Sequence, residues 1–144
     1  MAQYITTLST PLSTQDAFAY MEDLRNLRFW DPGTDGVKRI TGRGGVGTEY
    51  AVKLSFGSRP VLRYRVTEHE ESTRLRFVAR NAFFISDDRV EVWEAAAGGA
   101  VVRYDARLSL RGPLRWFDAG LRLAFRLLGD RAARGLAVAL RADA

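Results

Sequence analysis

The sequence predicts an α+β fold in which one curved antiparallel sheet of seven strands packs on a long C-terminal helix. Before Gly112, short runs of alternating apolar and polar residues are separated by turn sequences, a pattern typical of strands joined by hairpins. A short helical stretch interrupts them only once, after the first run. From Leu114 to about Arg141, apolar residues recur every three or four positions, which indicates a helix that buries one stripe.

The first strand is predicted over Gln3–Ser9, where side chains of opposite faces alternate. Ser13 and Asp16 fit a capping box, with Ser13 as the N-cap and Asp16 reaching back to it. The helix that follows places Ala17, Phe18, Met21 and Leu24 on one face and continues irregularly to Leu27 or Arg28. Residues 29–33, with the sequence FWDPG, then predict a turn with an aromatic entry.

Six further strands are predicted, with tight turns between them. They are Gly36–Ile40, Thr48–Phe56, Val61–Glu68, Arg74–Arg80, Phe83–Glu94 and Val101–Leu110. The glycines at 42, 44, 45 and 47 resemble a phosphate-binding loop, but no Lys-Ser/Thr follows and a strand comes next, so a hairpin turn is the better interpretation. Residues 68–72 are predicted to form a polar turn.

The register of Phe83–Glu94 depends on the loop at Gly98–Gly99. A loop with an even number of residues would place Trp93 on the same face as Tyr104. An odd loop would place Val92 there instead and leave Trp93 outside, near Arg103. We favour the odd loop, because it keeps Val90 and Val92 inside and the charged residues between them in water.

The C-terminal helix carries more apolar surface than one stripe requires. Pro113 suits the first helical position, where the missing N–H costs nothing. The buried stripe is predicted to hold Leu114, Phe117, Leu121, Phe125, Leu128, Ala132, Leu136 and Ala139. The opposite side holds Trp116, Leu123 and Leu127, flanked by Arg115, Arg122 and Arg126. This side predicts a homodimer or a contact with an anionic membrane, unless the short helices or a bend at Gly129–Asp130 cover it.

Composition sets the class of protein. The 144 residues suit one domain, 1–144, and the absence of Cys excludes disulfides and thiol nucleophiles. The N-terminus shows no signal peptide, so we expect a cytoplasmic protein. The net charge is +5, and 20 of the 22 basic residues are Arg. Because these are scattered along the strands, they predict a solvated surface and no nucleic-acid binding.

The inward-facing residues mix large rings with small side chains such as Ala79 and Ala106. A lining of this kind, mostly apolar with a few hydroxyls, has the character of a small-molecule pocket. The same pattern also fits a fully packed core, and the alternation alone does not decide between the two.

Several short motifs resemble the helix-grip fold of the START-like (SRPBCC) superfamily, which includes the birch-pollen-allergen-like proteins. They are residues 10–13 leading into 17–21, the aromatic turn at 29–32, and the segments 44–50, 98–104 and 112–114. The chain looks most similar to the bacterial polyketide cyclase/dehydrase and lipid-transport family. The resemblance implies two short helices between the first and second strands, and a cavity between the sheet and the last helix for an apolar or aromatic ligand.

The resemblance and the inward pattern together predict the ligand-binding residues. They are Trp30, near the cavity mouth, and Tyr50, Leu54, Tyr64, Phe77, Tyr104, Leu108, Phe117, Leu121 and Phe125. We expect a small hydrophobic ligand, such as a lipid or a polyketide-like molecule, bound without catalysis and without a cofactor. A polyketide cyclase or dehydratase is the alternative. A third, less favoured hypothesis is a nucleic-acid-binding or partner-binding domain without a cavity, which predicts a filled core and a one-sided basic patch.

Catalysis would require a positioned acid or base, and the sequence shows no such constellation. The single His, His69, is predicted to face solvent in a polar turn. Asp87 and Asp88 are adjacent on a strand and therefore point to opposite faces, so they do not form a dyad. Besides the tyrosines, Asp31 remains as a candidate near the mouth. No spacing of His, Asp and Glu predicts a metal site.

Overall fold

Seven antiparallel strands form one sheet in the described part of the chain, residues 1–55 and 58–142 of a computed structural model. The order across the sheet is β1-β7-β6-β5-β4-β3-β2. The strands are β1 (Ala2–Thr10), β2 (Thr34–Thr41), β3 (Glu49–Leu54), β4 (Val61–Glu70), β5 (Arg74–Arg80), β6 (Phe84–Glu94) and β7 (Ala100–Leu110). Of the predicted turn after β3, Gly57 lies outside the described residues, as does Phe56, the predicted end of that strand. The predicted α+β helix-grip architecture is confirmed.

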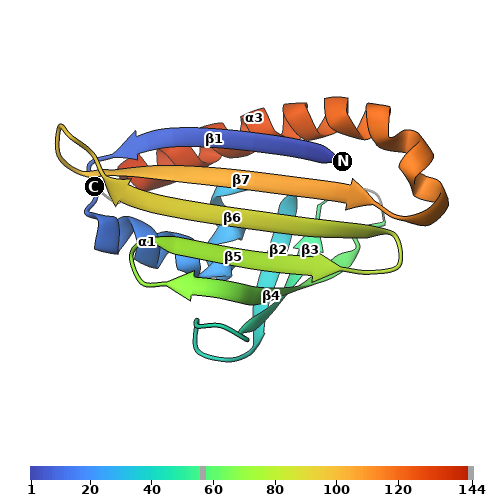
Figure 1. Cartoon of the computed structure of the whole chain (residues 1–144), viewed down its shortest axis with the longest axis horizontal. Helices are drawn as coiled ribbons and strands as arrows, with labels where there is room; N and C mark the ends of the chain where they lie inside the picture. Colours follow the sequence, from blue (N-terminus) through green and yellow to red (C-terminus); the bar gives the residue numbers. More distant parts are fainter. Residues whose placement is uncertain (56–57, 143–144) are drawn as a thin grey trace.

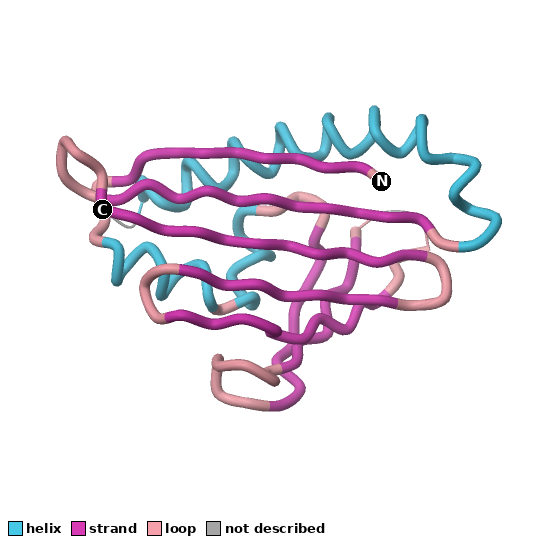
Figure 2. Tube along the Cα trace, in the orientation of Figure 1, coloured by secondary structure: helices cyan, strands magenta, loops and turns pink. Residues whose placement is uncertain are grey.

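The sheet is strongly curved. Figure 1 shows β2 and β3 turned across the direction of β5, β6 and β7, with the helices on the same side of the sheet. Figure 2 shows the same arrangement, with the long helix running beside β1. Bulges interrupt the β2–β3 and β4–β5 pairings, and a bulge bends its strand and increases the local twist. The concave face of the sheet and the helices therefore enclose one shared interior.

The helices are α1 (Thr14–Glu22), α2 (Leu27–Trp30) and α3 (Asp118–Ala142), with 3₁₀ turns η1 (Leu24–Asn26) and η2 (Gly112–Phe117). The predicted N-cap is confirmed, because the Ser13 hydroxyl accepts a hydrogen bond from the backbone N–H of Asp16 at 3.1 Å. The predicted irregular continuation of the helix after Ser13 consists of the 3₁₀ turn η1 and the short helix α2. Trp30 thus ends a helix, whereas the sequence pattern placed it in a turn.

The start of the last helix differs from the prediction. Gly112 has a positive φ of 61°, and the chain then forms η2, so that α3 begins only at Asp118. A 3₁₀ turn advances about 120° per residue instead of about 100°, which breaks the extrapolated stripe. Phe117 is consequently 68% exposed. Farther along, Leu136 and Leu140 are fully buried, whereas Leu121 and Phe125 are half-buried.

Two glycines allow α3 to approach its neighbours closely. A Cβ at Gly129 would collide with the ring of Tyr4 in β1, and one at Gly135 would collide with the carbonyl oxygen of Trp30 in α2. Near the C-terminal end, the Thr10 hydroxyl donates to the carbonyl oxygen of Leu140 at 3.1 Å. These contacts position α3 against the edge strand and the short helices.

Gly135→Ala should therefore lower the free energy of unfolding by about 1–3 kcal/mol, the usual cost of overpacking. The colliding atom is backbone, so no side-chain rotation relieves it. Urea denaturation measures the effect. Gly120→Ala is the matched control on the same helix, because nothing lies near its added methyl group, and the helix propensity of Ala should make it neutral or stabilising. Equal stability of the two variants would contradict the close packing.

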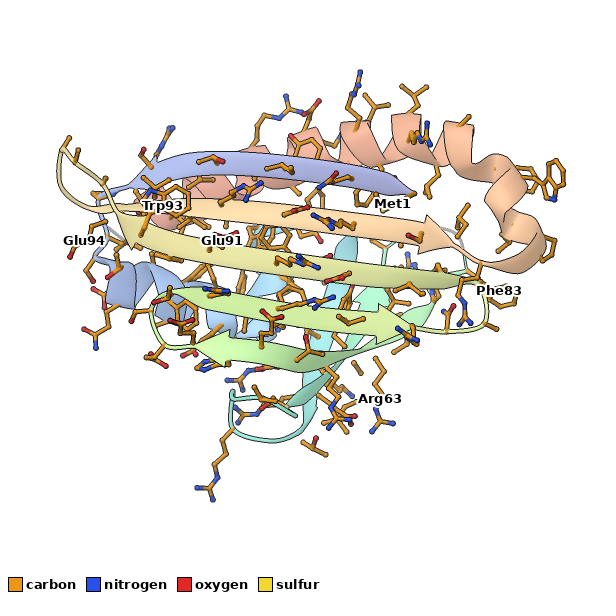
Figure 3. All side chains as sticks on the ribbon, in the orientation of Figure 1. Met1, Arg63, Phe83, Glu91, Trp93 and Glu94 are labelled. Atoms are coloured by element: carbon orange, nitrogen blue, oxygen red, sulfur yellow. The ribbon has the colours of Figure 1, made fainter. Side chains whose placement is uncertain are left out.

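The predicted register of β6 is confirmed. Val90 and Val92 are buried opposite Tyr104 and Val102, whereas Trp93 is 43% exposed. Figure 3 shows Trp93 on the outer face, near the end of β6 opposite to Phe83. The connecting loop spans residues 95–99, an odd number, as this register requires.

Candidate ligand site and buried carboxyl group

Four of the predicted ligand-binding residues meet in the interior. The ring of Tyr104 lies 5.4 Å from Trp30 and 6.4 Å from Phe77, and Phe77 lies 5.4 Å from Tyr64, each pair in an edge-to-face arrangement. Their exposed fractions are 7% or less. The four rings come from α2, β4, β5 and β7. The concave face thus gathers an aromatic cluster, and the strand alternation correctly predicted that its three strand residues, Tyr64, Phe77 and Tyr104, face inward.

A carboxyl group lies within this aromatic cluster. The hydroxyl of Tyr104 donates to Asp88 Oδ2 at 2.6 Å, and the hydroxyl of Ser86 donates to Oδ1 at a longer 3.5 Å. Tyr64 donates in turn to Ser86 Oγ at 2.7 Å. The four residues form one buried chain of hydrogen bonds, which we call the polar cluster, and no cationic side chain of the described residues pairs with it.

Burial changes the protonation of the polar cluster. Removal from water disfavours the carboxylate and raises the pKa of Asp88 to about 7, and the negative charges of Asp31 and Asp87 act in the same direction. The hydrogen bond from Tyr104 opposes the shift. Burial also raises the pKa of Tyr64 and of Tyr104 well above 10, so both phenols stay protonated. Near neutral pH, Asp88 can therefore either accept or donate a proton.

Asp31, the predicted acid near the mouth, is occupied by local structure. Its Oδ1 accepts from the backbone N–H of Gly33 at 2.9 Å, and its Oδ2 accepts from the Thr34 hydroxyl at 3.0 Å. These bonds close the turn between α2 and β2. Burial raises the pKa of Asp31, against the effect of both hydrogen bonds. Its contribution to the site is a negative charge near Asp88.

The other predicted ligand-binding residues are more dispersed. Tyr50 is fully buried opposite Tyr64 in the β3–β4 ladder. Leu54 is half-buried and packs against the core. Leu108, Leu121 and Phe125 are also half-buried. Phe117 faces solvent and does not join the aromatic cluster.

An open groove of about 620 Å³ lies between the short helices and α3. It is lined by Tyr20, Asn26, Phe29, Arg134, Gly135, Val138 and Ala139. Phe29 is 66% exposed, whereas the next residue, Trp30, contacts Tyr104 inside. The backbone of Trp30 thus lies beside the groove residue Gly135, and its ring contacts Tyr104 of the polar cluster. A second hollow, of about 400 Å³, lies between β1 and α3 and is lined partly by Arg122 and Arg126.

His69 does not lie in a solvent-facing turn. A bulge between Val66 and Glu68 shifts the register of β4, which extends to Glu70 and brings His69 opposite the buried Leu75. The imidazole is only 16% exposed, and its Nε2 lies 2.7 Å from Glu22 Oε2. The sequence-based prediction was wrong because alternation cannot reveal a bulge.

This register brings together three possible metal ligands. Ligand atoms of Glu22, His69 and Glu71 all lie within 4.8 Å of one another. The residues come from α1, from β4 and from the turn after β4, so no sequence spacing could have indicated the group. A nitrogen and two carboxylate oxygens would suit a divalent transition metal such as zinc. Glu71 is largely exposed, and the group lies apart from Asp88 on the strand ladder.

The buried carboxyl group was the main residue that sequence reasoning missed. Asp88 has the same parity along β6 as Val90 and Val92, so the register that was predicted correctly already placed it inside. As predicted, the adjacent Asp87 and Asp88 point to opposite faces and form no dyad, and only Asp88 faces the interior. The sequence could have revealed Asp88, because it lies two residues before Val90 and four before Val92 on a strand whose alternate side chains face inward.

Comparison with known sequences and folds agrees with this architecture. The family described as "Polyketide cyclase / dehydrase and lipid transport" matches residues 1–141. A START superfamily protein from Mycobacterium smegmatis is 12% identical, with a TM-score of 0.74 and 97% of each chain covered. The protein XoxI from Bacillus cereus is 14% identical, with a TM-score of 0.71, covering 97% of this chain and 96% of its own. No curated protein sequence matches significantly.

Proposed function

Because the chain belongs to the polyketide cyclase/dehydrase and lipid transport family, we propose that it binds a small hydrophobic or aromatic molecule between the sheet and α3. The observation that carries this proposal is the polar cluster within the rings of Trp30, Phe77 and their neighbours. An apolar interior with a few oriented hydroxyls suits a ligand that is mostly hydrocarbon and carries a carbonyl or hydroxyl group.

The groove beside α3 supports an entry route for this ligand. Its volume of about 620 Å³ falls within the range of small-molecule sites. Phe29 and Val138 give it an apolar lining, and Trp30, the residue after Phe29, contacts Tyr104. We propose that the ligand docks in the groove and that rotation of the Trp30 side chain admits it to the polar cluster.

Two measurements test the binding proposal. Native mass spectrometry of gently purified protein should detect a co-purifying apolar molecule. Titration with 1-anilinonaphthalene-8-sulfonate should show saturable binding that Phe29→Ala weakens by about fivefold or more, since this exposed ring lines the groove without supporting the core. Phe83→Ala, at a similarly exposed Phe away from the groove, is the control. Identical dye affinity in wild type and Phe29→Ala would contradict the entry route.

A second candidate function is cyclase or dehydratase chemistry, and Asp88 is the observation that favours it. With a pKa of about 7, its carboxylate can take a proton from a carbon next to a carbonyl group while a tyrosine hydroxyl donates to the carbonyl oxygen. An aromatic 1,3-diketone such as benzoylacetone is a suitable probe. Excess deuterium exchange at the carbon between its carbonyls should disappear in Asp88→Asn, and equal exchange in both proteins would exclude this role.

We further propose that Trp116, Leu123 and Leu127 belong to a contact surface for a membrane or a second copy of the chain. Their exposed fractions are 87%, 63% and 57%. Neither the short helices nor a bend of the last helix covers them. Among the described residues, no helix is long and apolar enough to cross a membrane. Any membrane contact through a helix of that part would therefore be peripheral.

A further inference from the structure

Three exposed aromatic side chains gather at one end of the sheet. Phe83, Trp116 and Phe117 are 58%, 87% and 68% exposed. The backbone N–H of Arg111 donates to the carbonyl oxygen of Phe83 at 2.6 Å, so the β5–β6 turn adjoins the residues that lead into η2. Figure 3 shows Phe83 at this end, away from Trp93. We call Phe83, Trp116 and Phe117 the aromatic end.

The charge around the aromatic end is positive. Residues 80–86 and 106–117 contain no Asp or Glu. Arg80 and Arg111 are exposed there, and Arg126 is exposed on α3. Within the part of the chain that the structure describes, none of these three forms an ion pair. The side chain of Arg115, a predicted flanking residue, lies outside the described residues.

Several arginines elsewhere on the sheet pair with carboxylates. Arg76 pairs with Asp87 at 2.7 Å, and Arg63 pairs with Glu49 at 2.7 Å. At the aromatic end, Arg80 and Arg111 form no ion pair within the described residues and accompany exposed aromatic rings. This combination is typical of surfaces that place rings at the headgroup level of a bilayer and bind lipid phosphates.

We propose that the aromatic end docks on an anionic membrane surface, with Trp116 and Phe117 inserted among the headgroups and with Arg80 and Arg126 near lipid phosphates. The proposal rests on the contact surface proposed above and commits it to a membrane. A symmetric homodimer through the same residues would place equivalent Arg-rich patches against each other, and this repulsion opposes association. A phosphate-rich bilayer removes that repulsion.

Vesicle co-sedimentation tests the proposal directly. Wild type should bind vesicles in which one third of the lipid is phosphatidylglycerol and should bind pure phosphatidylcholine at least tenfold more weakly. The double change Trp116→Ala with Phe117→Ala should reduce binding about tenfold or more, whereas Trp116→Phe should retain most of it. Arg80→Gln with Arg126→Gln should weaken binding to the anionic vesicles about tenfold or more, since each basic residue near the surface is worth roughly fivefold.

Trp93→Ala is the matched control, because Trp93 is exposed at the other end of β6 and should not matter. Tryptophan fluorescence adds a second measurement: anionic vesicles should shift the emission to the blue in wild type but not in Trp116→Phe. Unchanged binding of the Trp116/Phe117 variant, or absence of binding to anionic vesicles, would overturn the proposal. A wild-type dimer in light scattering that this variant converts to monomer would overturn it in favour of a second copy. Dye titration of the same variants reports separately on the ligand proposal.

Discussion

Phe77→Ala should lower the free energy of unfolding by about 3–5 kcal/mol, the usual cost of removing a fully packed ring. Phe77 is 1% exposed and contacts Tyr64 and Tyr104 on either side. The substitution deletes the ring that joins these two tyrosines and leaves a cavity beside Asp88. Urea or guanidinium denaturation at fixed pH measures the loss, with the slope of the transition reporting whether the unfolded state has changed.

Phe125→Ala is the matched control, because this ring belongs to α3 and is only half-buried. We expect it to cost less than half as much as Phe77→Ala. A loss below about 1 kcal/mol for Phe77→Ala would contradict tight packing and would show instead that the ring borders empty or wet space. The pair of variants therefore measures how much of the interior is filled by side chains in the absence of a ligand.

The strand alternation predicted most of the sheet because one face is buried and the other is solvated along nearly every strand. In β4, Leu62, Tyr64 and Val66 are buried, and the arginines between them are exposed. The pattern failed where the backbone departs from regular geometry. The bulge after Val66 reverses the parity, and His69 therefore faces α1 instead of water. A bulge adds one residue without leaving a signal in hydrophobicity.

The helical periodicity predicted α3 but not its beginning. Nothing in the spacing of Leu114 and Phe117 distinguishes an α-helix from a 3₁₀ turn, because residues three apart share a face in both. The difference depends on the backbone at Gly112, which adopts a positive φ of 61° before η2. This local geometry turns Phe117 outward, and the same segment supplies two of the three rings of the aromatic end.

The candidate site combines a predictable part with an unpredictable one. The inward direction of Tyr64, Phe77 and Tyr104 followed from alternation. Tyr64 and Phe77 meet across the neighbouring strands β4 and β5, whereas Phe77 and Tyr104 meet across β6. The hydrogen bond from Tyr104 to Asp88 depends on a pairing that the sequence does not specify: Asp88 lies opposite Ala106, two residues beyond Tyr104. A contact between diagonal neighbours on adjacent strands depends on how the strands pair in the folded sheet, so the sequence pattern alone does not predict it.

Asp88→Asn should change the pH dependence of stability more than any other single substitution at the site. In the folded chain the pKa of Asp88 is about 7, against 3.8 for an unperturbed Asp. Between these values the folded state holds one proton more than the unfolded state, so the free energy of unfolding falls as the pH rises from about 4 to about 7. The full penalty, about 4 kcal/mol for this shift, is present above pH 7. Asn carries no charge, so the Asp88→Asn variant does not have this penalty at any pH.

The stability of Asp88→Asn relative to wild type should therefore increase across the upper part of this window, measured by denaturation at about pH 5, 6, 7 and 8. Asp87→Asn is the neighbouring control on the outer face. The hydrogen-bonded Arg76 lowers the pKa of Asp87 below 3.8, so Asp87 is ionised in both states throughout these measurements and its variant should show a constant difference. A constant difference for Asp88→Asn as well would mean that water reaches Asp88 and keeps it charged. The proton-transfer role would then lose its physical basis, because a carboxyl group that titrates near 4 is too weak a base for that chemistry at neutral pH.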